Sequence, residues 1–189
     1  GNPLDATARV RGNEAEFEAP GGKTSFEVDG GDQIIVVQST GYKPARLPVT
    51  MEAGKRIPLE AKLESARAKV TKEKIEILDK VYFDTALATI KPESFGLLGD
   101  VASLLDANPD VRKLRVEGHT DQRGDDDQNQ QLSQERAESV MAWLVANGIA
   151  ADRLEAVGYG ETKPVDQTKN RKAYDLNRRV EFTILERDK

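Results

Sequence analysis

The chain has 189 residues, of which 38% are hydrophobic and 32% are charged. This composition is typical of a globular protein with one or two small domains, and no apolar run is long enough to span a membrane. The 28 basic and 33 acidic residues give a net charge of -5, which argues against a nucleic-acid partner. The sequence has no cysteine, which excludes disulfides, thiolate zinc sites and cysteine nucleophiles.

Residues 1–66 are predicted to form a small all-β domain, a β-sandwich. Pairs of glycines separate the first apolar-alternating runs, and no segment has helical periodicity over a useful length. The turn and strand patterns at 41–44 and 52–59 resemble those of carboxypeptidase-regulatory-like or PEGA-type sandwich modules. A structural spacer is the plainer interpretation of this domain. The expected strands lie at 15–18, 25–28, 33–38, 45–51 and 56–63.

Residues 67–189 are predicted to form a second domain, in which strands alternate with helices. Pro92 suits the first position of a helix that ends at Asn108, before Pro109. Ser133 is expected to cap a second helix, which ends at Gly148. Strands joined by helices and short loops favour a two-layer α/β sandwich, so the whole chain is expected to be α+β. The expected strands lie at 75–77, 81–83, 114–116, 154–157 and 179–185, and the expected apolar helix faces carry Phe95, Leu98, Val101 and Leu105, and Ala137, Val140, Met141 and Leu144.

The most informative stretch joins the end of a predicted strand, a polar loop and the start of the second helix. Asp121 follows the strand directly, and Arg136 is expected in the first turn of the helix. A basic residue there opposes the helix dipole, so another interaction is expected to hold it. A carboxylate and a guanidinium in one cleft would suit a zwitterion, because the first accepts from an ammonium group and the second grips a carboxylate.

Four motifs occur in the order found in the OmpA C-terminal family, which the second domain resembles over residues 75–187. They are VYFD at 81–84, GHTD at 118–121, the pattern of Asn129 with LSQERA at 132–137, and NRRVEF at 177–182. Peptidoglycan-associated lipoproteins and MotB-type stator proteins carry the same domain. The resemblance therefore implies a periplasmic protein that binds the cell wall and tethers an envelope or outer-membrane component to it.

The family resemblance also implies a ligand and its contacts. Family members bind the diaminopimelate of the peptidoglycan stem peptide without a cofactor or a metal. By position in the motifs, Asp121 would hold the ligand's ammonium and Arg136 its carboxylate. Further hydrogen bonds would come from residues at the other motif positions, which are Asp84, Thr120, Asn129 and Arg178.

Two positions depart from the family pattern. Gln128 stands where many relatives have an aromatic residue before the asparagine, and this could weaken the packing of the loop. Residues 173–175 (AYD) replace the usual Gly-Arg-Ala before NRR, which changes the lip of the C-terminal loop that would face the ligand. Neither departure changes Asp121 or Arg136.

Several of these residues have a structural interpretation as well. Asp121 and Arg136 could form an internal ion pair that holds the loop to the helix, and Asp84 could be a turn or capping residue. His119, the only histidine, is expected to hydrogen-bond backbone, since no serine nucleophile is placed beside it. The acidic run 125–127 lacks the ligand spacing of a calcium loop and is expected to be a solvated loop, while Trp143 is expected in the core.

Three functions remain open at this point. The first is a non-enzymatic peptidoglycan-binding module, and the second is a stator-type wall anchor of a motor complex. The third is a wall hydrolase with paired carboxylates such as Asp121 and Glu161, although nothing near them suggests a raised pKa. Because residues 1–3 read Gly-Asn-Pro, we expect any export signal or membrane anchor to lie upstream of this chain.

Overall fold

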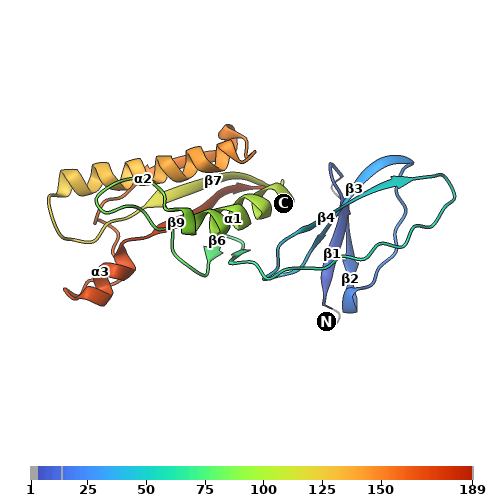
Figure 1. The fold of residues 1–189 in the computed structure, drawn as a ribbon, viewed down its shortest axis with the longest axis horizontal. Helices are drawn as coiled ribbons and strands as arrows, with labels where there is room; N and C mark the ends of the chain where they lie inside the picture. The colour runs from blue at the N-terminus through green and yellow to red at the C-terminus, as the bar shows by residue number, and fades with distance from the viewer. Residues whose placement is uncertain (1–3, 14, 189) are drawn as a thin grey trace. The chain divides into compact units, whose positions relative to one another are not determined.

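The computed structural model describes residues 4–13 and 15–188, which divide into two compact units, Gly1–Ala66 and Arg67–Lys189. Each unit has its own sheet, as the ribbon in Figure 1 shows, and its own core of buried hydrophobic residues. Both sheets and all three α-helices of the described residues fit the predicted α+β class. None of the described helices has both the length and the apolar character that a membrane span requires.

The first unit is all-β, as predicted, and its described strands form one antiparallel sheet in the order β2-β1-β3-β4. The apolar face of this sheet is covered by irregular chain that carries Phe26 and Val28, where the prediction placed a second sheet. Phe26 stacks on Phe17 of the sheet with ring centroids 4.2 Å apart. The strands predicted at 25–28 and 56–63 are irregular in the structure. The observed strands are β1 (Ala6–Val10), β2 (Glu16–Ala19), β3 (Gly31–Gln38) and β4 (Ala45–Met51).

The second unit has a five-stranded sheet in the order β5-β6-β9-β7-β8. Strands β7 and β8 are parallel and are joined by helix α2, whereas β9 pairs antiparallel to both β7 and β6. Helices α1 and α2 share one core with the sheet, which gives the predicted two-layer sandwich. The strands are β5 (Ala68–Val70), β6 (Lys74–Ile77), β7 (Val111–Gly118), β8 (Leu154–Gly158) and β9 (Val180–Arg187), and the helices are α1 (Phe95–Ala107), α2 (Asp126–Ala146) and α3 (Arg171–Asn177).

Helix α1 lies where the sequence predicts it. A 3-10 turn at Pro92–Ser94 leads into it, and Asn108 caps its C-terminal end. Leu98, Val101 and Leu105 are fully buried, but Phe95 is 41% exposed and stacks on Trp143 of α2 at 5.9 Å. Phe95 and Trp143 therefore lie at the edge of the core.

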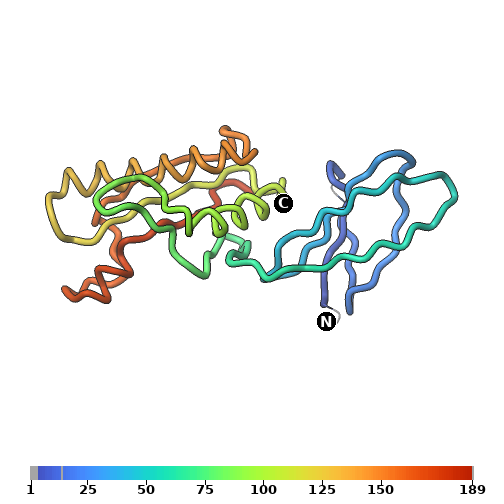
Figure 2. Tube along the Cα trace, viewed as in Figure 1, coloured from blue at the N-terminus to red at the C-terminus, as the bar shows by residue number. Residues whose placement is uncertain are grey.

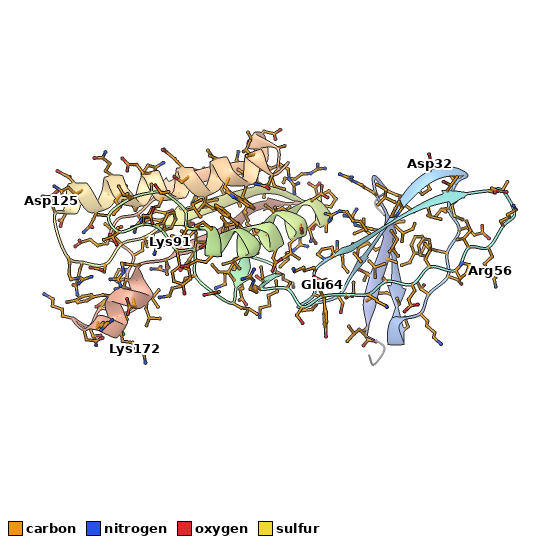
Figure 3. All side chains as sticks on the ribbon, viewed as in Figure 1. Asp32, Arg56, Glu64, Lys91, Asp125 and Lys172 are labelled. Atoms are coloured by element: carbon orange, nitrogen blue, oxygen red, sulfur yellow. The ribbon has the colours of Figure 1, made fainter. Side chains whose placement is uncertain are left out.

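Helix α2 begins seven residues earlier than Ser133, so the prediction that Ser133 caps this helix is wrong. The cap is Asp125, whose carboxylate accepts from the backbone N–H of Gln128 at 3.0 Å. Figure 3 labels Asp125 at this end of the helix. Asp126 and Asp127 occupy the first turn, where negative charge is favourable to the helix dipole. The acidic run predicted to be a solvated loop therefore starts the helix.

The early start of α2 was not visible in the apolar pattern, because the buried stripe of the helix is polar at this end. Asn129 and Ser133 continue the spacing of Ala137, Val140 and Leu144 and are buried with them. Ser133 Oγ donates to Gln130 O and accepts from the backbone N–H of Gly160, both at 2.8 Å. The polar end of the stripe thus packs against the chain that follows β8.

Glycines allow α2 to lie close to the ends of β7 and β8. A Cβ on Gly118 would overlap the backbone oxygen of Ser133, and one on Gly158 would overlap the backbone of Gln134. The helix can approach the sheet this closely only where both strand ends lack side chains. This approach sets the position of the loop that carries Asp121 against α2.

Candidate functional site

The candidate site is built around the loop between β7 and α2, at the end where β7 stops. Thr120 N–H donates to Gly160 O at 2.9 Å, which joins the loop to the chain after β8. Asn129 of α2 is buried, and its Nδ2 donates to the backbone oxygens of Asp121 and Arg123 at 3.3 and 3.2 Å. The same nitrogen lies 2.8 Å from Oε2 of Glu161. These contacts hold the backbone of the loop around Asp121 in one conformation.

Asp121 is nearly buried and is surrounded by donors. Its Oδ1 accepts from the backbone N–H and Nε of Arg123 at 3.0 and 2.9 Å. Its Oδ2 accepts from Nη2 of Arg123 at 2.9 Å and from Nη1 of Arg178. The hydrogen bonds from Arg123, followed by the one from Arg178, lower the pKa of the Asp121 carboxyl to about 2 although burial opposes this shift. Asp121 is therefore ionised at neutral pH.

Arg178 continues this chain of charges beyond Asp121. Its Nη2 bonds Asp175, which lies in α3. Helix α3, which the sequence analysis did not predict, leads into β9 and is traced in Figure 2 just before that strand. This helix contains residues 173–175, which differ from the family pattern. The guanidinium carbon of Arg123 lies 4.5 Å from the centre of the Tyr174 ring. Tyr174 and Asp175, which depart from the family pattern, thus contact the two arginines that bond Asp121.

Arg136 lies in the middle of α2 rather than in its first turn, so the predicted conflict with the helix dipole does not arise. Its Nε donates to Leu87 O at 3.0 Å, and its guanidinium lies 4.9 Å from the centre of the Phe83 ring. Among residues 4–13 and 15–188, no carboxylate forms an ion pair with Arg136. Burial, followed by the charge of Arg178, lowers the pKa of Arg136 from its usual value.

The structural interpretation in which Asp121 and Arg136 form an ion pair with each other is wrong. Asp121 pairs with Arg123 and Arg178, and the charge of Arg178 reaches Arg136. Arg178 thus bonds Asp121 directly, and its charge repels that of Arg136. The arrangement leaves the two Nη groups of Arg136 without a bond to any described residue, on a partly buried side chain.

The other predicted site residues are less directly placed for a ligand. Asp84 lies in the loop whose Leu87 contacts Arg136, but its own carboxylate bonds no described residue. The Thr120 hydroxyl is buried and has no hydrogen-bond partner among the described residues. Asn129 supports the loop through its amide nitrogen. The sequence analysis assigned no role to Arg123 in the site, although its position two residues after Asp121 allows the contact.

His119 differs from its prediction as well. Its side chain is 1% exposed, and neither imidazole nitrogen has a hydrogen-bond partner among the described residues, whereas a bond to backbone was expected. Burial, followed by the charge of Arg179, lowers its pKa to about 4, so the imidazole is neutral at pH 7. Glu117 and Glu181 lie nearby, but the charges of Arg179 and Lys163 also act on the imidazole and disfavour a cation there.

Residues 82–178 match the family model described as the OmpA family. The outer-membrane lipoprotein YfiB of Pseudomonas aeruginosa is 42% identical over 105 residues, which is 56% of this chain and 62% of YfiB. Outer membrane porin F of Pseudomonas fluorescens is 40% identical over 104 residues, which is 55% of this chain and 32% of the porin. The chain thus spans less than two thirds of the length of these curated relatives.

Solved structures with the same fold cover a similar part of the chain. The peptidoglycan-associated lipoprotein from Burkholderia pseudomallei is 32% identical with a TM-score of 0.51, over 56% of this chain and 90% of the lipoprotein chain. The cell wall anchor of the T6SS from Pseudomonas aeruginosa is 30% identical with a TM-score of 0.54, over 64% of this chain and 88% of the anchor. Since the family model covers slightly more than half of its residues, this chain belongs to the OmpA family.

Proposed function

We propose that the second unit binds peptidoglycan non-covalently through the diaminopimelate of its stem peptide, and that the protein tethers an envelope or outer-membrane component to the wall. The proposal rests first on Arg136. A partly buried guanidinium whose Nη groups bond no described residue, and which feels the charge of a second arginine, has a favourable place for a carboxylate, which it can bind with two parallel hydrogen bonds. The ionised Asp121 supplies the opposite charge for an ammonium group.

The related proteins support the same class of ligand. One of them is titled a peptidoglycan-associated lipoprotein and another a cell wall anchor. Membership in their family, together with an acidic and a basic group that both interact with the charge of Arg178, favours a zwitterionic part of the wall as the ligand. This proposal places the protein in the periplasm, in contact with the wall and near the outer membrane. We propose that residues 67–189 alone carry the wall site and that residues 1–66 act as a spacer.

A binding module fits the site better than a wall hydrolase does. A hydrolase with paired carboxylates needs one acid whose pKa is raised so that it stays protonated near neutral pH. The pKa of Asp121 is lowered to about 2, and its oxygens are engaged by arginines. This carboxylate cannot serve as the proton donor of such a mechanism.

The test compares binding of the full chain to purified sacculi that contain either diaminopimelate or lysine at the third stem position. We expect co-sedimentation with the diaminopimelate wall, competed by free diaminopimelate, and weaker binding to the lysine wall, which lacks the second carboxylate. Arg136→Ala should weaken binding to the diaminopimelate wall by about 30-fold or more, since truncating one partner of a buried charge pair costs about 2–5 kcal/mol. It should change binding to the lysine wall much less.

Arg112→Ala is the matched control, because it removes an arginine that is exposed and lies at the opposite end of β7. This variant should bind both walls like the unmodified chain. Equal binding of the unmodified chain to both walls would contradict the role of Arg136. Retention of wall binding by a fragment of residues 1–66 would show that the site lies in the other unit.

A further inference from the structure

Every acceptor position of Asp121 is already used in the free protein. A carboxylate offers about four lone-pair sites on its two oxygens. Oδ1 accepts two hydrogen bonds from Arg123, and Oδ2 accepts one from Arg123 and one from Arg178. A ligand's ammonium group therefore cannot bond Asp121 until one of these donors leaves.

The side chain of Arg123 is the donor that can leave most easily. It is 60% exposed, whereas that of Arg178 is 37% exposed and is also held by Asp175. The backbone N–H of Arg123 can keep its bond to Oδ1 when the side chain swings away. Apart from Asp121, the Arg123 guanidinium lies against the ring of Tyr174 in α3, 4.5 Å from its centre.

We infer that Arg123 is a competitor built into the chain, whose guanidinium occupies on Asp121 the place of the ligand's ammonium group. This inference rests on the proposed function. Exchange of one cation for another at Asp121 gives little net free energy, so an amine alone should bind poorly. A ligand that also brings a carboxylate to Arg136 gains an interaction that Arg123 cannot replace. Arg123 thereby weakens binding of every ligand that uses Asp121, and a ligand with an amine alone has no second interaction that offsets this loss.

Removal of the competitor should strengthen binding. Exposed ion pairs contribute about 0.2–1 kcal/mol, so Arg123→Ala should lower the Kd for diaminopimelate sacculi, and for free diaminopimelate, by about 1.4- to fivefold. Binding to lysine-type sacculi should strengthen by a similar factor, because the ammonium group is common to both walls. Tyr174→Ala, which removes the ring under Arg123, should change the Kd in the same direction by a smaller factor.

The experiment measures these constants at one ionic strength, by sedimentation with sacculi and by calorimetry with free diaminopimelate. Arg112→Ala is the control for loss of charge, because this arginine is 61% exposed and is also paired with an aspartate, Asp188. The control should leave the Kd unchanged. Fluorescence of Trp143, the only tryptophan, checks that each variant keeps the fold of the second unit.

A second measurement reads the contact directly in the free protein. The Nε–H signal of Arg123 in NMR spectra should be protected from exchange with water, and Asp121→Asn should remove that protection. An unprotected signal would overturn the inference. An unchanged or raised Kd for Arg123→Ala, while the unmodified chain binds sacculi, would overturn the inference alone. If neither chain binds sacculi, the proposed function fails and the inference fails with it.

Discussion

The ion pairs of Asp121 should make a measurable and pH-dependent contribution to the stability of the second unit. Asp121→Asn keeps the shape of the side chain and removes its charge. The folded state lowers the pKa of this carboxyl from 3.8 to about 2, and its side chain is 6% exposed. One pKa unit corresponds to about 1.4 kcal/mol, so the substitution should lower the free energy of unfolding by about 2 kcal/mol at pH 7.

This difference should disappear in acid, and the direction follows from the lowered pKa. A carboxyl with a depressed folded pKa stabilises the protein fully above its unfolded value of 3.8, and the contribution is lost as pH falls through about 2. The free energies of unfolding of the two chains should therefore converge between pH 4 and pH 2. Titration of His119 also affects stability in acid, but both chains contain it, so its effect cancels in the difference.

Urea unfolding followed by Trp143 fluorescence measures this difference, because the only tryptophan lies in α2 of the second unit. Asp188→Asn is the control, since Asp188 is an exposed aspartate paired with an exposed arginine, and its loss should change stability by no more than about 0.5 kcal/mol. A stability difference for Asp121→Asn that stays constant from pH 7 to pH 3 would refute the reasoning. So would the absence of any loss at pH 7.

Three further predictions follow from the fold. Gly118→Ala should destabilise the second unit by about 1–3 kcal/mol or prevent folding, because the new Cβ meets the backbone of Ser133, and a wild-type urea midpoint would contradict that close approach. Asp125→Ala should lower the free energy of unfolding by about 1 kcal/mol, because it removes the cap of α2, and the same urea unfolding curve measures this loss. An unchanged free energy of unfolding would indicate that the helix starts at Ser133 instead. The single histidine signal in a proton NMR titration should move near pH 4, since burial lowers the pKa of His119, and a midpoint near 6.5 would show an exposed imidazole.

Elements with a local signal were predictable from the sequence. Pro92 and Asn108 mark the two ends of the segment that contains helix α1, and apolar residues at helical spacing predict its buried face. Strand β4 was predicted at its observed position, and β3 was predicted two residues short at its start. Apolar residues, consecutive in β3 and alternating in β4, lie there between glycine and proline turns. Elements without such a signal were missed. Helix α3 is seven residues long and has only two buried residues, so it shows no apolar stripe.

The start of α2 shows why a polar pattern misleads. The helix is buried at its N-terminal end through Asn129 and Ser133, whose hydrogen bonds go to residues of other loops. The apolar stripe, followed toward the N-terminus, ends at Ala137, so the sequence analysis placed the cap at the nearest serine before it, Ser133. Asp125, followed by two more aspartates, was the capping signal in the sequence.

The sequence by itself predicted a second domain, which the structure has as a compact unit, and it led to the proposal that Asp121 and Arg136 bind a zwitterion, because the motifs around each of them are contiguous and specific. It could not determine the partners of those residues. Arg123, Arg136 and Arg178 carry the same charged group, and only the folded chain decides which of them reach Asp121. Arg178 lies 57 residues from Asp121, and it pairs because β9 runs antiparallel beside β7 and starts where β7 ends. Ion pairing depends on distance in space, which strand order and loop packing set.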